Sequence, residues 1–547
     1  MKSKKIRSVI ALGLATIMTM SACGKSEGTT NKESETVSAV ASESKTSEAA
    51  TETQKGEEPV ELSIWLLQTE GFEYEDNDMT RALEEKFNVD IKFEFTSPSE
   101  STKTAYNLML ASREYPDILL GRQLNAAQVT AGVEAGALLP LNEYIVEGTN
   151  FKRALDENES WEKNLTTMDG NIYTFMYTDV GVHKMSEYKM WYRADWLETL
   201  GWDNPPSTPE EFKEYLIAIR DNDVNGNGDA TDEIPLMGYY GGRKTDPICF
   251  LMNPFELYTD KYYYITEDNE IHFSATTDGW REGLAYIADL YAEGLIAEET
   301  YVQDQATFKA LLNKTGENAL VGTFPCWYNG QEIDTSVMSW FTYEALAPLA
   351  GEYQQSAANT ESFAMLGAIS TTCEHPDIAF AILDYMIGDD FRTGVEGEDY
   401  EWVDQESWIG TKPSLKELDD DGIKNDSWNA GQWPVWDSME KRYGKTKDES
   451  IFETDNTWVL LKAAEKYEPY YVNHNIPSVV WAEEDVMTAE SEYSTLINEY
   501  ILTANTEFVM GRKDINNDAE WKEYLDTLDS MGLQEYIELL YTYYGLK

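Results

Sequence analysis

The sequence predicts an α/β protein in which the strands of a parallel sheet are joined by crossover helices. Residues 60–120 alternate between strand-like and helix-like patterns of apolar side chains, an order typical of βαβ units. The chain has 547 residues, 42% of them hydrophobic and 12% aromatic, which is enough to bury a large core. At about 150 residues per domain, we expect two to four folded units.

Five segments make up the alternation: a strand over 60–66, a helix over 79–87, a strand over 89–95, a helix over 104–112 and a short buried strand over 117–120. Ligands of parallel sheets bind beyond the carboxyl ends of the strands. The loops after Leu66 and Leu120 carry Gln68 and Arg122, and we expect these two side chains to face a ligand. The alternative is that both are solvated turn residues without a function.

The charge balance excludes several classes of function. With 42 Lys and Arg against 100 Asp and Glu, the formal net charge is −58. A chain this acidic repels nucleic acids and anionic lipids at long range. We therefore expect no nucleic-acid partner and no electrostatic attachment to a membrane.

The first 23 residues have the pattern of a bacterial lipoprotein signal peptide. A basic stretch over 2–7 precedes an apolar stretch over 9–20 that is too short to span a membrane. Cys23 follows, and the residues MSAC before Gly24 resemble a lipobox, in which the Cys thiol receives a diacylglyceryl group with chains such as palmitate. The alternative is an ordinary secretory signal with an incidental Cys. Because two acyl chains suffice for stable anchoring, we expect Cys23 to hold the protein on the outer face of the cell membrane.

Residues 24–59 are predicted to be a disordered tether. They are rich in Ser, Thr, Glu, Lys and Ala and contain no aromatic residue, so they cannot bury enough apolar surface to fold. A flexible coil of this length has a reach of roughly 30 Å. The tether would keep a globule near the membrane while letting it turn.

A well-marked helix precedes the most informative motif of the chain. Thr208 is predicted to be its N-cap, Pro209 its first residue, and Glu211 the partner that completes a capping box. An apolar face then follows at Phe212 and Tyr215.

Residues 221–233, DNDVNGNGDATDE, have the composition of a calcium-binding loop. Counted from Asp221, oxygen-bearing residues fall at positions 1, 3, 5, 7, 9 and 12 of an EF-hand, with Gly226 at the turn. These residues are Asp221, Asp223, Asn225, Asn227, Asp229 and Asp232. Position 12 is Asp, although Glu233 is adjacent, and Ile234 begins an extended segment in place of a second helix. We expect a structural Ca²⁺ site and no sensor; an acidic turn without metal is the alternative.

No motif of catalysis is present in the sequence. There is no nucleophile elbow, P-loop, HExxH or GxGxxG after a strand, and the 4 histidines lack metal-ligand spacing. Apart from Cys23, three widely spaced cysteines remain, Cys249, Cys326 and Cys373, which predict neither a disulfide framework nor a zinc site. We therefore expect no enzyme.

Aromatic residues beside polar loops point to a ligand with stacking faces. Trp327 and Tyr328 follow a strand-like segment over 320–324, and Trp402 and Trp408 lie in a segment rich in Gly, Asp and Asn. The C–H faces of sugars stack on aromatic rings while polar neighbours bind the hydroxyls. The alternative for each ring is ordinary core packing.

Several segments, in their order along the chain, resemble a known family. They are WYRADWLETLG (191–201) with PPSTPEEFKEYL, the acidic loop ending in DEIPL, LYAEGLIAEE (290–299), STTCEHPDIAFAILDYMIGDD leading to GVEGEDYEWV (370–403), and FVMGRKDINNDAEWKEYLDTLDSMGLQEYIELLYTYYG near the end. Together they resemble the family 1 extracellular solute-binding lipoproteins, in particular the large LipO-like branch attached to carbohydrate ABC importers.

The resemblance implies a two-lobed, periplasmic-binding-protein-like fold with a ligand cleft between lobes and hinge crossings. After the signal peptide over 1–23 and the tether over 24–59 expected above, it implies lobe one over 59–180 plus 335–395 and lobe two over 181–334 plus 396–547. It places the Gln68 and Arg122 loops on one side of the cleft. Trp327, Tyr328, Trp402 and Trp408 would line the other.

The resemblance also implies a function. The protein would be a monomeric, lipid-anchored binding protein that captures an oligosaccharide and delivers it to ABC permease subunits. A cell-surface glycan hydrolase or glycan adhesin using the same aromatic residues is the alternative. The negative charge of the chain favours a neutral glycan over a uronate.

Overall fold

The structure is a computed structural model of the chain. It describes residues 58–69, 72–96, 102–121, 123–242, 244–358, 362–389, 391, 400–418, 428, 432–448 and 456–546. The predicted signal peptide with Cys23, the tether except its last two residues, and Arg122 lie outside the described residues. Within the described part of the chain, no helix is both long and apolar enough to cross a membrane.

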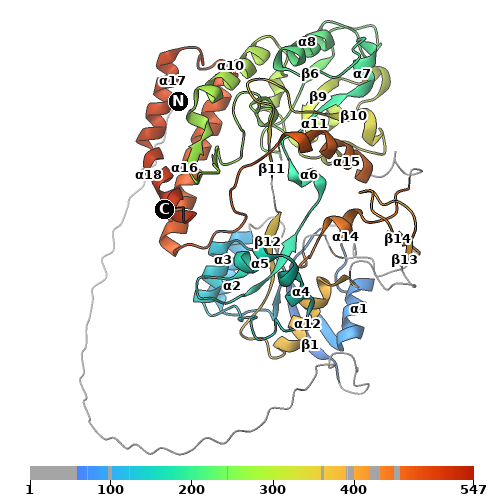
Figure 1. The fold of residues 1–547 in the computed structure, drawn as a ribbon, viewed down its shortest axis with the longest axis vertical. Coiled ribbons are helices and arrows are strands. Elements are labelled where there is room, and N and C mark those ends of the chain that lie inside the picture. Colours follow the sequence, from blue (N-terminus) through green and yellow to red (C-terminus); the bar gives the residue numbers. More distant parts are fainter. Residues whose placement is uncertain are drawn as a thin grey trace, which may run out of the picture. The chain divides into compact units, whose positions relative to one another are not determined.

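Five strands form the first sheet, in the order β2-β1-β3-β12-β4. Figure 1 labels β1 and β12 of this sheet. They are β1 (Val60–Leu67), β2 (Val89–Thr96), β3 (Ile118–Leu119), β4 (Thr174–Thr178) and β12 (Phe363–Ile369). β1 is parallel to both β2 and β3, and the helices α1 (Asp78–Phe87) and α2 (Thr102–Ser112) form the two crossovers. The predicted alternation over 60–120 is confirmed, and with it the α/β class.

β12 enters this sheet from far along the sequence. It pairs antiparallel with β3 on one side and with β4 on the other. Helix α12 (Pro376–Met386) packs on β12, and α5 (Glu159–Leu165) packs on β4 and on α4 (Asn150–Glu157). Helix α3 (Ala126–Glu134) follows β3, and its capping box joins Asn125 and Gln128.

Four strands form the second sheet, in the order β10-β5-β9-β6. They are β5 (Met190–Arg193), β6 (Ile234–Leu236), β9 (Val321–Pro325) and β10 (Tyr343–Leu346). β9 is the strand predicted over 320–324. Helix α8 (Pro209–Arg220) packs on β6, and α7 (Ala194–Thr199), α9 (Ile248–Leu251) and α11 (Gln305–Leu312) lie between strands of this sheet in the sequence.

The predicted cap of α8 is present with one difference. The Thr208 hydroxyl accepts a hydrogen bond from the Glu211 N–H at 3.2 Å, as expected of an N-cap. The Glu211 carboxylate accepts from the N–H of Ser207 at 2.9 Å, one residue before the predicted partner. Both residues named by the sequence pattern therefore take part in capping the first turn.

The remaining elements are α6 (Val182–Met185), α10 (Asp278–Ala292), α14 (Met439–Tyr443), α15 (Asn456–Tyr467), α16 (Glu484–Val509), α17 (Asp518–Ser530), α18 (Leu533–Tyr543), and the strand pairs β7 (Tyr263–Ile265) with β8 (Ile271–Phe273), β11 (Ser356–Ala358) with β15 (Tyr471–Asn473), and β13 (Tyr400–Val403) with β14 (Ser414–Glu417). Helix α16 packs against α10 and α18, and α15 packs against α6 and β10.

Two separate clusters of buried apolar side chains form the cores, one around each sheet. Residues 179–189, the crossing segment below, join β4 of the first sheet to β5 of the second. The division into two lobes stays a proposal, and core membership revises its boundaries. Residues 343–346 belong to the second sheet, whereas Trp428, Trp433 and Trp436 are buried in the first core.

Candidate ligand-binding site

Four rings gather where the crossing segment meets the end of β9. They belong to His183, Trp327, Tyr328 and Trp340 and are called the aromatic cluster below. The His183 ring centroid lies 5.0 Å from that of Trp327 and 5.6 Å from that of Tyr328, and Tyr328 stacks on Trp340 at 6.0 Å. All four residues are half-buried. Rings that are fixed in place yet partly exposed suit an apolar ligand face.

Polar contacts fix Trp327 at both ends. Its indole N–H donates to the side-chain oxygen of Gln331. The Gln331 amide donates in turn to Glu332 at 2.8 Å, and the buried Glu332 carboxylate also accepts from Tyr239 at 2.8 Å. The Trp327 carbonyl accepts from the ammonium of Lys189 at 3.4 Å. The position of this ring is therefore set before any ligand arrives.

Lys189 joins the crossing segment to the aromatic cluster. Besides the Trp327 carbonyl, its buried ammonium donates to the carbonyls of His183, at 3.0 Å, and Ser186. Burial lowers the pKa of Lys189 to about 7, an effect that Glu187 opposes. Burial also lowers the pKa of His183 to about 3, with Lys189 acting in the same direction. His183 is thus neutral at physiological pH.

A second charged group lies at the start of the crossing segment. The Arg442 guanidinium contacts Asp179 at 2.9 Å and Asp437 at 2.6 Å, and the Asp437 side chain is fully buried. Burial would raise the pKa of Asp179, but Arg442 and Lys184 hold it below its ordinary value. The hydroxyl of Tyr443 accepts from the Val182 N–H at 3.0 Å. Helix α14 therefore fastens the crossing segment.

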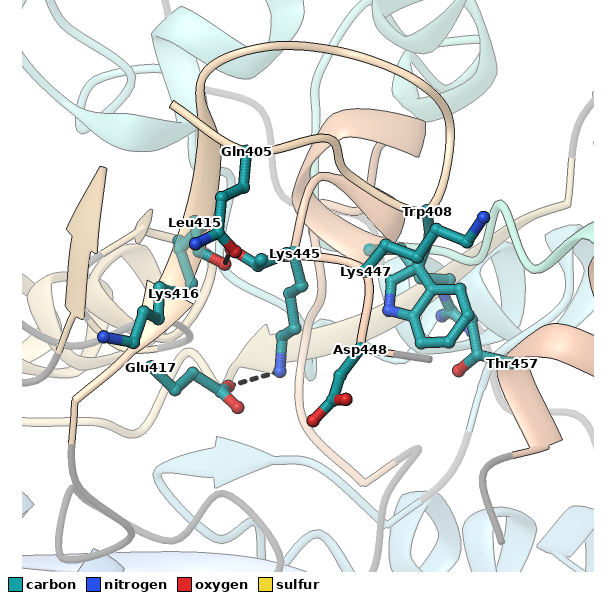
Figure 2. A pocket seen from close by; sticks show the side chains of 11 residues that line it. Gln405, Trp408, Leu415, Lys416, Glu417, Lys445, Lys447, Asp448 and Thr457 are labelled. Atoms are coloured by element: carbon teal, nitrogen blue, oxygen red, sulfur yellow. Dashed lines mark hydrogen bonds and ion pairs between the residues drawn. The ribbon is translucent and has the colours of Figure 1, made fainter. Parts of the chain in front are cut away.

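Arg442 also lines a cavity of about 600 Å³. Figure 2 shows Lys416 and Glu417 on one side, Trp408, Lys447 and Thr457 on the other, and Lys445 between them, paired with Glu417. The full lining is Gln405, Trp408, Leu415, Lys416, Glu417, Arg442, Lys445, Thr446, Lys447, Asp448 and Thr457. An indole among many hydrogen-bonding groups is a surface for a polar ligand with an apolar face.

Helix α15 connects this cavity with the aromatic cluster. Asn456, its first residue, donates to the Tyr328 hydroxyl at 2.7 Å, and Trp458 in the same turn lies 6.1 Å from Trp408 between ring centroids. Three of the predicted ligand residues, Trp327, Tyr328 and Trp408, thus lie around one helix end.

The other predicted ligand residues are not brought together with these. Trp402 lies on β13 with its side chain 51% exposed, and it does not line the cavity. Gln68 is exposed after β1. The carbonyl of Leu67, the residue before it, accepts a hydrogen bond from the Gln432 side chain at 2.6 Å. Arg122 lies outside the described residues.

The loop after β3 lines a second, smaller cavity. Its volume is about 350 Å³, and Gln123 and Asn125 line it together with Met365, Val479 and Tyr543 among others. The loop in which the sequence predicted a ligand contact therefore does border a cavity. That cavity shares no lining residue with the one around Trp408.

The predicted calcium loop joins α8 to β6, and its hydrogen bonds centre on Asp223. The Asp223 carboxylate accepts from the N–H groups of Gly226, Asn227 and Gly228 at 2.8 to 3.0 Å. Asp221 instead pairs with Arg220 at 2.8 Å. Counted from Asp223, positions 1, 3 and 5 are Asp223, Asn225 and Asn227, and Gly228, with φ of 91°, takes the turn position 6. This geometry favours Asp223 over the expected Asp221 as the first position.

The far end of the loop carries two further carboxylates. Asp232 accepts from the Asn225 and Asn227 amides at 3.2 and 2.8 Å. Glu233 is buried, accepts from the Asn225 N–H through Oε1 at 3.3 Å, and has no partner for Oε2. Burial raises the pKa of Glu233. Among the described residues, no cluster of three or more His, Cys, Asp or Glu is arranged to hold a metal. Asn side chains, which such a cluster does not include, also offer hard oxygen ligands for Ca²⁺, and this loop contains several of them.

The fold and the site define a class of protein. Aromatic rings fixed beside the crossing segment and a polar cavity lined by Trp408 and Arg442 are features of a binding site for polar solutes. The chain belongs to the bacterial extracellular solute-binding proteins, whose family model matches residues 70–392. The resemblance seen in the sequence is confirmed.

Two relatives extend this result. The chain is 26% identical over 464 residues to FusA, the fructooligosaccharide ABC transporter substrate-binding protein of Streptococcus pneumoniae serotype 4, covering 80% of this chain and 81% of FusA. It is 28% identical over 244 residues to lipoprotein LipO of Bacillus subtilis, which covers 44% of this chain and 46% of LipO. FusA is the binding protein of a transporter, in agreement with the expectation that the chain is no enzyme.

A solved structure has the same fold. The S. pneumoniae FusA EF-hand mutant in complex with fructo-nystose matches with a TM-score of 0.67 at 22% identity, over 89% of this chain and 99% of that structure. The periplasmic-binding-protein-like architecture expected from the sequence is therefore confirmed.

Proposed function

We propose that the protein captures an oligosaccharide outside the cell and delivers it, as a monomer, to the permease of an ABC importer. The aromatic cluster, fixed at the crossing segment, is the observation that carries this proposal, because sugar rings stack on such faces without a charge to desolvate. The relative FusA is a fructooligosaccharide-binding protein, which supports the same ligand class. A hydrolase is not favoured, since that relative is a binding protein.

The ligand would bind against Trp327, Tyr328 and Trp408. A ligand shifts a conformational equilibrium only by its different affinity for the two states. Contacts that form only when both lobes touch the sugar would therefore drive closure. Arg442 and Lys189 hold the crossing segment next to these rings. A sugar that binds to the rings would therefore affect the conformation of the crossing segment.

Trp327→Ala tests the site directly. We expect about ten-fold weaker binding of oligosaccharide, since stacking contributes up to about 1.5 kcal/mol beyond burial. Isothermal calorimetry with a panel of fructo-, gluco- and uronate oligosaccharides of two to five sugars measures the change. Trp402→Ala is the matched control, because that ring is exposed and does not line the cavity. Equal losses in both variants would remove the aromatic cluster from the site.

We further propose that the loop between α8 and β6 holds one structural Ca²⁺. The loop supplies hard oxygen donors for such an ion. They belong to Asp223, Asn225 and Asn227 at positions 1, 3 and 5, and to Asp229, Asp232 and Glu233 later in the loop. The unpartnered, buried Oε2 of Glu233 fits such an ion, because a buried carboxylate oxygen without a partner is costly. The related FusA structure is that of an EF-hand mutant, which supports a site of this kind. Bound Ca²⁺ would hold the loop against β6 and take no part in sugar binding.

Calcium binding has a measurable consequence for stability. At ten times its Kd, Ca²⁺ should stabilise the chain by about 1.4 kcal/mol and raise its melting temperature by a few degrees. Asp223→Ala should abolish this shift. Asp221→Ala should retain it, because Asp221 pairs with Arg220 outside the loop's hydrogen bonds. A shift that depends on Asp221 and not on Asp223 would restore the numbering first expected from the sequence.

The place of action follows from the amino terminus. We propose that Cys23 is acylated and that residues 24–59 tether the globule to the outer face of the cell membrane. The lipoprotein LipO is a relative, which supports an anchor of this kind.

A further inference from the structure

His183 is the member of the aromatic cluster that carries hydrogen-bonding groups on its ring. The side chain is half-buried, between Trp327 and Tyr328 on one side and the backbone of Gly181 on the other. A Cβ atom added to Gly181 would lie 2.6 Å from Cε1 of the imidazole. The ring is therefore confined between two aromatic neighbours and a glycine.

The two ring nitrogens of His183 have different surroundings. Nδ1 is buried and has no hydrogen-bond partner. Nε2 also lacks a hydrogen-bond partner among the described residues, and it is not one of the buried unpartnered atoms. A buried N–H without an acceptor is rarer in proteins than an unsatisfied acceptor, so the tautomer with its proton on Nε2 is favoured. Nε2 is then the hydrogen-bond donor of the ring.

The charges around His183 keep the ring neutral. Burial is the main reason that its pKa is lowered to about 3, and the positive charges of Lys189, Lys184 and Arg442 act in the same direction, while Asp179 opposes them. The ammonium of Lys189 also donates to the His183 carbonyl at 3.0 Å, which fixes the backbone beneath the ring. A neutral donor is suited to a sugar oxygen because it needs no counter-charge.

We propose that His183 is a ligand-binding residue whose Nε2–H donates a hydrogen bond to an oxygen of the bound sugar, at the edge of the faces that Trp327 and Tyr328 offer. This inference rests on the proposed function and specifies one contact of that site. Stacking positions the sugar ring but is tolerant of its rotation in the plane. A single directional donor at the rim of the stack selects one orientation of the hydroxyls.

Replacements at His183 separate its donor from its ring. The probe is the oligosaccharide of the panel above that wild type binds most tightly, measured by calorimetry. His183→Ala and His183→Phe should each bind it about five-fold more weakly, because both lack the donor and Phe keeps the ring. His183→Gln should bind within about two-fold of wild type, since the Gln amide nitrogen can occupy the place of Nε2. His375→Gln, at an exposed position before α12, is the matched control and should leave affinity unchanged.

A spectroscopic readout distinguishes contact from a structural role. With only 4 histidines in the chain, the imidazole ¹⁵N signals can be assigned by the loss of one set in His183→Gln. The His183 signals should show a neutral Nε2–H tautomer and shift on saturation with sugar.

Two outcomes separate this inference from the proposed function. If wild type binds an oligosaccharide while His183→Ala and His183→Phe bind it equally well, the inference is wrong and the function stands. The same holds if the His183 signals do not respond to saturating sugar. If wild type binds no sugar in the panel, the proposed function fails first.

Discussion

Arg442→Met is expected to destabilise the protein by about 3 kcal/mol. The substitution removes the guanidinium from Asp437, which is fully buried, and leaves Asp179, which is 8% exposed, with Lys184 as its remaining cation. Removing one partner of a buried ion pair typically costs about 3 to 5 kcal/mol. Because Arg442 is partly exposed, we expect the loss of stability to lie near the lower limit of this range. Chemical denaturation measures the loss. Lys416→Met is the control, because its pair with Glu401 is exposed on both sides and should contribute less than about 1 kcal/mol.

The pH dependence identifies the cause of that loss. The pKa of Asp179 is held below its ordinary value, so its ion pair contributes fully above about pH 4 and is lost as the pH falls through the lowered pKa. In Arg442→Met, Asp179 has lost one of its two cations and can take up a proton at higher pH. The gap in stability between wild type and variant should therefore narrow from pH 7 to pH 4. The double variant Arg442→Met/Asp437→Asn should recover part of the loss. A gap that is independent of pH would assign the loss to packing.

Cys23→Ser is expected to move the protein from the membrane to the medium. Cys23 is the acyl acceptor that the signal sequence offers, and a serine hydroxyl cannot take the thioether-linked diacylglyceryl group. Without two acyl chains no stable anchor remains, because the strongly acidic chain is repelled by anionic lipids. Fractionation of cells and medium, with detection of the protein in each, measures the redistribution.

Cys249→Ser is the control for this redistribution, since that thiol is buried in the fold. It should leave the protein at the membrane. Mild proteolysis should in addition release an intact globule from wild-type cells by cleavage within residues 24–57. Detergent-dependent extraction of Cys23→Ser would contradict the lipoprotein assignment.

The parts of the fold that could be predicted are the strands and helices whose apolar residues recur at regular spacing along the sequence. The strands at 60–67 and 89–96 alternate with period 2, and α1 between them has its apolar residues at helical spacing. β12 was not predicted, because its place between β3 and β4 depends on pairing with distant residues. For the same reason Trp428, which the expected boundaries place in lobe two, is found buried in the first core beside Thr80.

The rings of Trp327, Tyr328 and Trp408 in the candidate site were predicted as ligand contacts, whereas His183 and Trp340 were not. Trp327 and Tyr328 were found because paired aromatic residues after a strand are conspicuous. His183 and Arg442 carry no motif, and their roles arise from where the crossing segment and α14 meet. The calcium loop shows a different limit. Oxygen-bearing residues at alternate positions fit two registers, and only the N–H donors to Asp223 distinguish them.

The most direct test of oligosaccharide capture is a tryptophan-fluorescence titration of the whole chain, released from the membrane as Cys23→Ser, with the panel of oligosaccharides. Trp327 and Trp408 lie at the proposed site, so a bound sugar must change the surroundings of at least one indole. We expect a saturable change with at least one oligosaccharide, and a smaller or absent change in Trp327→Ala. No change with any sugar, together with a saturable change on adding peptides of similar size, would contradict oligosaccharide capture and make peptides the ligand of this fold.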